Sequence, residues 1–120
     1  MTLSNTGSFT ITATRSSGGT QAGTSAAFTV NPGAVSATAS TATVPAGTAG
    51  SVTTITVQAK DASGNNRTNA TGITAVAASV TGANTATPSV TNNGNGTYTL
   101  TYTPTASGTD NVAITMNVGA

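Results

Sequence analysis

Few side chains in this sequence could do acid–base or covalent chemistry. There are two carboxylates, Asp61 and Asp110, and three cations, Arg15, Lys60 and Arg67, and the chain has no histidine and no cysteine. Catalytic triads and thiolate nucleophiles need histidine or cysteine, and zinc and calcium sites need more ligands than two carboxylates supply. We therefore expect a protein that is not an enzyme, binds no metal and needs no cofactor.

A lysine can still react covalently when it is buried beside an acid, by forming an isopeptide cross-link with Asn or Asp. Lys60 stands next to Asp61 at the end of one expected strand, and Asp110 and Asn111 begin another. In an alternating sandwich those strand ends lie at opposite poles. The better interpretation of Lys60 is a solvated charge in a turn.

Two tyrosines could form a platform on which a sugar stacks. Tyr98 and Tyr102 share one parity with Leu100, however, and the threonines between them occupy the other. Alternation of this kind indicates a strand with one apolar face. At least one tyrosine is therefore expected in the core, with its hydroxyl at the rim.

Three triplets match the N-glycosylation pattern, at Asn66, Asn69 and Asn95. In a chain this rich in Asn and Thr such triplets arise by chance, and we take them only as marks of exposed loops. The dipeptides Asn93-Gly94 and Asn95-Gly96 predict a hairpin turn of the primed type, in which both central residues have positive φ.

The low charge of the chain restricts its partners. Only 4% of the residues are charged, against roughly 25% in ordinary soluble domains. Nucleic-acid binding needs clustered Lys and Arg, so no nucleic-acid partner is expected. Polarity comes instead from Thr, Ser, Asn and Gly, as in extracellular, cell-surface or virion proteins. The start of the chain has no signal-peptide pattern, and no apolar run approaches a membrane span.

Period-two patterning, broken by Gly, Asn and Pro, predicts an all-β protein. The expected strands cover residues 7–14, 24–30, 34–47, 51–60, 73–80, 86–92, 97–103 and 111–118. In the expected strand over residues 34–47, Pro45 is expected to interrupt pairing. For the strand over residues 73–80, the pattern does not show which side chains point to the core. The apolar faces that the pattern does define are Phe9/Ile11/Ala13, Ile55/Val57/Ala59, Tyr98/Leu100/Tyr102 and Val112/Ile114/Met116/Val118.

Two stretches, 49–68 and 93–117, resemble the filamin-type immunoglobulin-like repeat and its relatives in bacterial adhesins of the invasin and intimin sort. The residues that carry the resemblance lie in one loop and along one strand and its flanking turns: Asp61, Gly64, Asn65, Gly96, Thr97, Tyr98, Tyr102 and Gly108. The resemblance implies a seven-stranded antiparallel β-sandwich that serves as a spacer, adhesive or crosslinking module. The near absence of charge departs from the filamin pattern.

The resemblance also divides the chain. Residues 7–14 align with 108–116, so residues 1–32 are expected to form a β-hairpin like the last two strands of a preceding repeat. Residues 33–120 then supply the first six strands of an immunoglobulin-like domain, and nothing after Val118 supplies the seventh. An open sheet edge recruits a strand. We therefore expect exchange between chains, with Ala27, Phe28 and Val30 of one chain against Val112, Ile114 and Met116 of another.

The sequence thus favours a non-catalytic structural repeat that self-associates into a dimer, another homo-oligomer or a filament. The alternative is an adhesin module that binds a glycan or a peptide.

Overall fold

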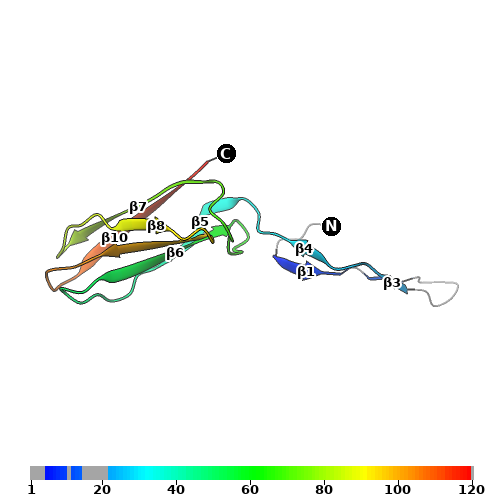
Figure 1. Cartoon of the computed structure of the whole chain (residues 1–120), viewed down its shortest axis with the longest axis horizontal. Coiled ribbons are helices and arrows are strands. Elements are labelled where there is room, and N and C mark those ends of the chain that lie inside the picture. The colour runs from blue at the N-terminus through cyan, green and yellow to red at the C-terminus, as the bar shows by residue number, and fades with distance from the viewer. Residues whose placement is uncertain (1–4, 11, 15–21, 120) are drawn as a thin grey trace.

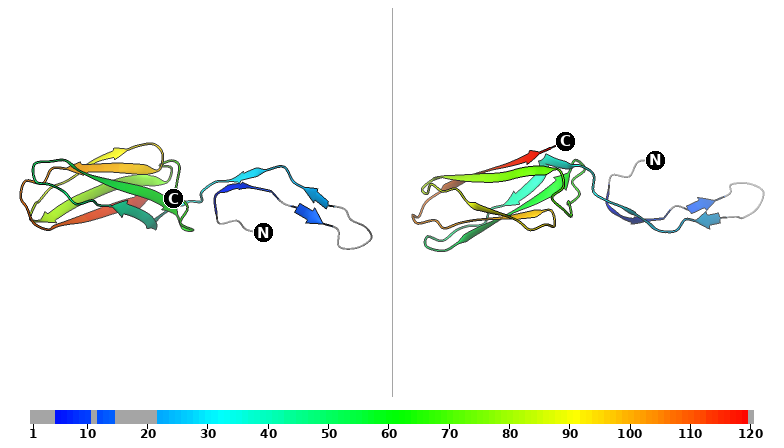
Figure 2. Two further views of the ribbon diagram at one scale, coloured as in Figure 1. Left: turned by 90° about the horizontal axis from the view of Figure 1, so that it is seen from below. Right: turned by 45° about the horizontal axis from the view of Figure 1, so that its top comes forward.

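A computed structural model describes residues 5–10, 12–14 and 22–119 of the 120-residue chain. It is elongated, 77 × 29 × 20 Å, with a long hairpin projecting from one end of a β-sandwich (Figures 1 and 2). The described residues form strands and no helix. Ile11 lies outside the described residues, as do the side chains of Phe9 and Ala13, so the predicted apolar face of that strand stays a prediction.

The hairpin contains four short strands. β1 (Gly7–Phe9) pairs with β4 (Phe28–Val30), and β2 (Thr12–Thr14) pairs with β3 (Ala22–Thr24), both antiparallel. The continuous strands expected over 7–14 and 24–30 are therefore each split in two. Residues 25–27 are not in a strand, which separates β3 from β4.

The sandwich is built from six antiparallel strands in two sheets. Its strands are β5 (Val35–Thr43), β6 (Thr53–Asp61), β7 (Ile73–Gly82), β8 (Ser89–Asn92), β9 (Thr97–Tyr102) and β10 (Asp110–Val118). One sheet has the order β5-β6-β9-β8, and the other contains only β10 and β7. β5 ends two residues before Pro45, whose ring removes a backbone donor. This is the immunoglobulin-like antiparallel β-sandwich that the sequence predicts.

The strands alternate between two ends of the sandwich. We call the end where the hairpin joins the proximal pole; β5 begins there, and β6 and β10 end there. We call the other end the distal pole; it carries the loops 44–52, 83–88 and 103–109. The sequence predicted that Lys60 and Asp110 occupy opposite poles, and the strand order confirms this.

The core lies between β6 and β9 on one side and the narrower sheet on the other. Ile55 and Leu100 are completely buried and directly paired across the two strands, and Val57 pairs with Tyr98, which is 5% exposed. This confirms the predicted inward faces of both strands. Partly buried apolar side chains from the second sheet pack against this row: Val76, Ala78, Val112, Ile114 and Met116.

Packing also decides the face of β7, which its sequence leaves open. Val76, Ala78 and Val80 are buried or half-buried, while Ala75, Ala77 and Ser79 are exposed. Alanine is small and apolar on both faces of this strand, so its pattern carries little signal. The paired strand β10 of the same sheet provides the missing information, because Val80 pairs with Val112 and Val76 with Met116 and paired residues share a face.

The polar face of β9 is partly covered. Thr99 and Thr101 are half-buried, because β9 is an inner strand flanked by β6 and β8.

The hairpin turn at residues 93–96 is not of the primed type that the sequence predicts. Among the described residues only glycines have positive φ, here Gly94 (+78°) and Gly96 (+84°). Adjacent positive φ values are therefore avoided, and each glycine takes the left-handed conformation alone.

The two faces of β9 should differ in stability effects. Leu100→Ala removes a fully buried side chain, and we expect the free energy of unfolding to fall by roughly 2–5 kcal/mol. Thr101→Ala, on the other face, should change it by less than about 1 kcal/mol. Urea unfolding of the two variants measures both values. Equal losses would mean that the outer face of this sheet is also covered.

Candidate strand-binding site

The outer edge of β10 is the most distinctive feature of the sandwich. β7 pairs with one edge of β10 along its whole length, from Asp110 opposite Gly82 to Val118 opposite Ile73. Along the other edge, no strand of the described part of the chain pairs with β10. Unpaired backbone donors and acceptors along an edge are a template for another strand.

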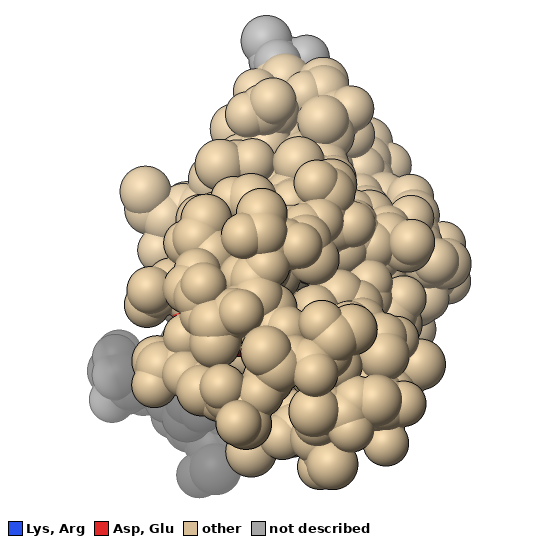
Figure 3. All heavy atoms as spheres, turned by 90° about the vertical axis from the view of Figure 1, so that its left-hand side faces the viewer, with Lys and Arg blue, Asp and Glu red and all other residues tan. Residues whose placement is uncertain are grey.

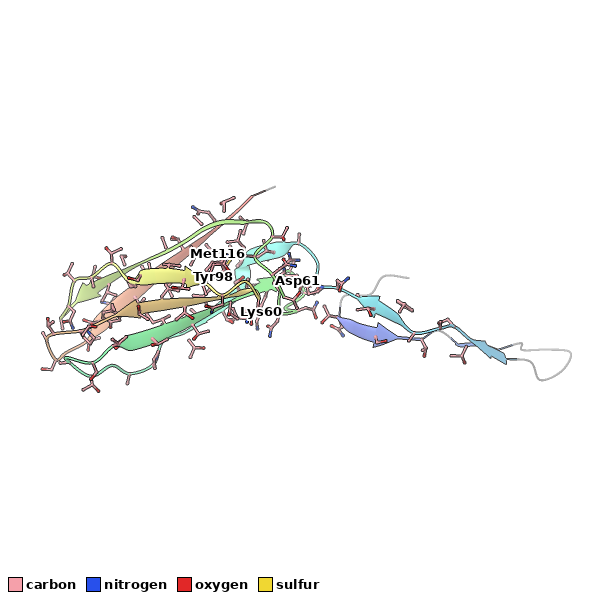
Figure 4. All side chains as sticks on the ribbon, viewed as in Figure 1. Lys60, Asp61, Tyr98 and Met116 are labelled. Carbon is pink, nitrogen blue, oxygen red and sulfur yellow. The ribbon has the colours of Figure 1, made fainter. Side chains whose placement is uncertain are left out.

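The side chains of β10 alternate in burial along this edge. Val112, Ile114 and Met116 are half-buried, whereas Ala113 and Thr115 between them are exposed. We call the three half-buried residues the acceptor row. They face the core, as the sequence predicts, and Figure 4 shows Met116 and Tyr98 between the two sheets. Val118, which the sequence places on the same face, is exposed instead, because the pairing with β7 shifts register between Asn117 and Val118.

A groove of about 120 Å³ runs between β10 and β5, the edge strand of the opposite sheet. Ile114 and Met116 form one wall, and Val57 lies at the floor. The other wall comes from β5: Ala37, Ser40, Thr41 and Ala42. Between Ser36 and Thr41 the pairing of β5 with β6 shifts register. There the Lys60 backbone N–H donates to the Ser40 hydroxyl at 3.0 Å.

The expected donor residues lie far from this groove within the chain. Phe28 is 36% exposed and Val30 half-buried in β4, and Ala27 is exposed just before it. β4 and β1 form a separate sheet beyond the proximal pole (Figures 1 and 2). Within one molecule, the structure does not bring Ala27, Phe28 or Val30 to the acceptor row.

Asp61 organises the proximal pole. Its carboxylate accepts the backbone N–H groups of Gly33 (2.9 Å), Ser63 (3.0 Å) and Asn65 (2.9 Å). The Asn65 side-chain amide donates to both oxygens, at 3.2 and 3.0 Å. Hydrogen bonds from the Asn65 side chain and the Gly33 backbone lower the Asp61 pKa to about 2.

Arg67 also binds the linker of residues 31–33, which joins the hairpin to the sandwich. One guanidinium nitrogen, Nη1, donates to the carbonyl oxygens of Pro32 (3.3 Å) and Gly33. The other, Nη2, donates to Asn69 Oδ1 (3.0 Å) and the Thr71 carbonyl (3.2 Å). Asp61 and Arg67 together therefore hold the linker 31–33 against the sandwich. Lys60 and Asp61 lie at this pole, where the hairpin begins (Figure 4).

Sequence reasoning missed the role of Arg67. Its only signal in the sequence is a cation inside the loop of residues 61–72. The sequence also carries no signal for the contact of Asp61 with Gly33, although Asp61 and Asn65 are among the residues that resemble the filamin pattern.

The distal pole contains a second carboxylate network. Asp110 accepts the Asn84 backbone N–H (2.8 Å), the Asn84 side-chain amide (2.9 and 3.2 Å) and the Tyr102 hydroxyl (3.1 Å). Burial opposes ionisation of Asp110, but the Asn84 and Tyr102 hydrogen bonds outweigh it and lower its pKa. Burial and the neighbouring Asp110 raise the Tyr102 pKa.

Beside this network is a hollow of about 420 Å³, which we call the distal hollow. It lies between the β5–β6 loop and the β9–β10 loop, and its lining includes Val44, Pro45, Pro104, Ala106 and Val112. Figure 3 views the molecule from this end and shows a surface almost without charged side chains.

The two tyrosines and the three asparagines singled out in the sequence have other surroundings. Tyr98 is a core residue, and burial raises its pKa. Tyr102 uses its hydroxyl for Asp110, so the two tyrosines do not form a stacking platform. Asn66, Asn69 and Asn95 are exposed in loops, as predicted.

Within residues 5–10, 12–14 and 22–119, no three of the Asp, Glu, His or Cys side chains gather as metal ligands would. In the same part of the chain no helix has the length and apolar character of a membrane span.

A model of the protein family described as Filamin/ABP280 repeat matches residues 29–118. That match spans the linker and every strand of the sandwich. The chain belongs to the filamin repeat family. A filamin repeat is a structural immunoglobulin-like module of a non-catalytic kind, which agrees with the architecture above. The comparison with curated proteins finds no match to this chain.

The stability of this filamin repeat should decrease in acid. Asp61 has a folded pKa of about 2 against an ordinary value of 3.8, so the unfolded chain binds the proton more strongly. The stabilisation is present above pH 4 and is lost as the pH falls from about 4 towards 2. Asp61→Asn should show a shallower loss over the same range, leaving the contribution of Asp110. Urea unfolding between pH 2 and 6 measures this, and identical slopes in both proteins would contradict it.

Proposed function

We propose that this filamin repeat is a non-catalytic, self-associating module, and that the open edge of β10 takes a strand from a second copy of the chain. The observation that carries the proposal is the acceptor row. Val112, Ile114 and Met116 face the core from a strand that is paired along only one edge. A strand added to that edge would pair its backbone with β10 and cover these side chains.

The segment 24–30 matches that edge in pattern. An incoming strand that runs antiparallel to β10 can place Val30 opposite Val112, Phe28 opposite Ile114 and Ala26 opposite Met116. Phe28 is 36% exposed in its own molecule, so moving it against the core removes apolar surface from water. Ala27 points to the other face of an extended strand, which leaves Phe28 and Val30 as the residues that can cover the acceptor row.

Closure within one molecule is disfavoured by distance. A strand lying antiparallel to β10 ends at the distal pole, while β5 begins at the proximal pole, roughly 25 Å away for strands of seven or eight residues. The linker 31–33 spans about 10 Å even when extended, and Asp61 and Arg67 hold it at the proximal pole. Closure within one molecule would therefore have to unfold part of β5 and use it as connector. Donation of the strand to a second molecule leaves β5 folded.

The geometry of exchange sets the kind of assembly. Reciprocal exchange closes a dimer, and one-way exchange continues as a filament. The composition supports work outside the cell, at a cell surface or on a virion, because a hydroxyl-rich surface with 4% charged residues resembles proteins of those places.

An open edge can also bind an extended peptide from another protein, which is the second candidate function. The same unpaired side of β10 favours it. The two candidates differ in the sequence of the strand that binds. A glycan receives less support, because Tyr98 is buried and the Tyr102 hydroxyl is already donated.

A matched pair of variants in β4 tests strand donation. Phe28→Asp places a charge on the side chain that should enter the core of the partner, and Thr29→Asp places the same charge on the opposite face. We expect Phe28→Asp to weaken self-association by roughly tenfold to a hundredfold, because burying a Phe side chain contributes roughly 1.5–3 kcal/mol. Sedimentation equilibrium of both variants and the parent chain measures the dissociation constants.

The second arm adds a synthetic peptide of residues 24–31 to the full chain. It should dissociate the assembly, whereas a peptide with the same composition in scrambled order should not. A parent chain that stays monomeric at high concentration and binds neither peptide would overturn the proposal. Equal action of the scrambled peptide would favour general peptide binding.

A further inference from the structure

We infer that the distal hollow receives the linker Asn31–Pro32–Gly33 of a second copy. This inference rests on the proposed strand donation and names the part of the partner that lies beyond the donated strand. It concerns a different set of residues from the acceptor row, and it joins the two poles of neighbouring molecules.

The first observation is the continuity between the acceptor row and the hollow. Val112 is the distal member of the acceptor row, and it also lines the distal hollow. A donated strand that places Val30 opposite Val112 therefore ends at the mouth of the hollow. The next residues along the donor chain are Asn31, Pro32 and Gly33.

The second observation is the short reach of the donor chain. Gly33 is already attached to the donor's own proximal pole, through its N–H to Asp61 (2.9 Å) and its carbonyl to Arg67. Residues 31–33 span at most about 10 Å. The proximal pole of the donor must therefore lie within about that distance of the distal pole of the acceptor. Contact between the two poles follows from strand donation itself.

The third observation is the fit in size and chemistry. The hollow has a volume of about 420 Å³, within the roughly 300–1,000 Å³ of protein ligand pockets. Val44, Pro45 and Pro104 in its lining are apolar groups suited to the Pro32 ring, and Asn84 and Asp110 add polar groups to the same lining. The surface around the hollow has few charged side chains (Figure 3), so it does not repel a neutral linker, and the Asp110 carboxylate in the lining already accepts hydrogen bonds from Asn84 and Tyr102.

Two peptides separate this inference from strand donation. The acceptor is the full chain carrying Phe28→Asp, whose own segment is disabled. The short peptide contains residues 24–30, and the long peptide contains residues 24–33 and so includes the linker. We expect the long peptide to bind about tenfold more tightly by titration calorimetry, which corresponds to about 1.4 kcal/mol.

A pair of arginine variants, each added to that acceptor, locates the gain. Ala106→Arg places a long charged side chain in the lining of the distal hollow, and Thr91→Arg places the same side chain on the exposed strand β8. Ala106→Arg should abolish the advantage of the long peptide without changing the affinity of the short one. Thr91→Arg should leave both affinities unchanged.

Equal binding of both peptides would overturn the binding of the linker in the distal hollow while leaving strand donation intact. An advantage of the long peptide that survives Ala106→Arg would also overturn it, because the gain would then come from another surface. If neither peptide binds, both proposals are contradicted: the donation of the strand and the binding of the linker in the distal hollow.

Discussion

One apolar row holds the sandwich together, and its incomplete cover governs much of the rest. Ile55 and Val57 of β6 lie beside Leu100 and Tyr98 of β9, and all four are buried. Four strands supply one side of this core, but only β7 and β10 cover it from the other. The half-buried state of the acceptor row and the unpaired edge of β10 therefore have the same cause, which is the small number of strands in the second sheet. Each Å² of apolar surface left in water forgoes about 25 cal/mol of stabilisation.

The two carboxylates of the chain lie where neighbouring loops offer several backbone and side-chain donors. Asp61 at the proximal pole and Asp110 at the distal pole each accept several N–H or O–H donors from neighbouring loops. Carboxylates bind such donors more strongly than neutral acceptors do. Each pole is thereby given a defined shape, although the loops themselves contain mainly small polar residues. At the proximal pole, this network fixes the position at which the linker joins the sandwich.

Strand direction, linker length and pole geometry together describe how one repeat would follow another. β10 runs from the distal to the proximal pole, so an added antiparallel strand runs the opposite way and leaves at the distal pole. In the proposed assembly the short linker would place the next sandwich close to that pole, because Asp61 and Arg67 hold the linker at the proximal pole of its own molecule. The elongated shape of the single chain, with its hairpin directed away from the sandwich, accords with such an axial arrangement (Figure 1).

The sequence by itself determined the strands and inward faces of β6, β9 and β10, because alternation of large apolar residues with threonine is a local signal. It also indicated the filamin resemblance through residues such as Asp61 and Gly96. The tertiary structure alone decided the face of alanine-rich β7 and the half-burial of Thr99. It also explains Gly96, where a Cβ would lie 2.1 Å from the Arg67 carbonyl oxygen. The hold of Arg67 on the linker and the distal hollow were likewise hidden, since they join residues far apart in the chain. No local pattern encodes such contacts; they exist only once the strands have brought their loops to a common pole.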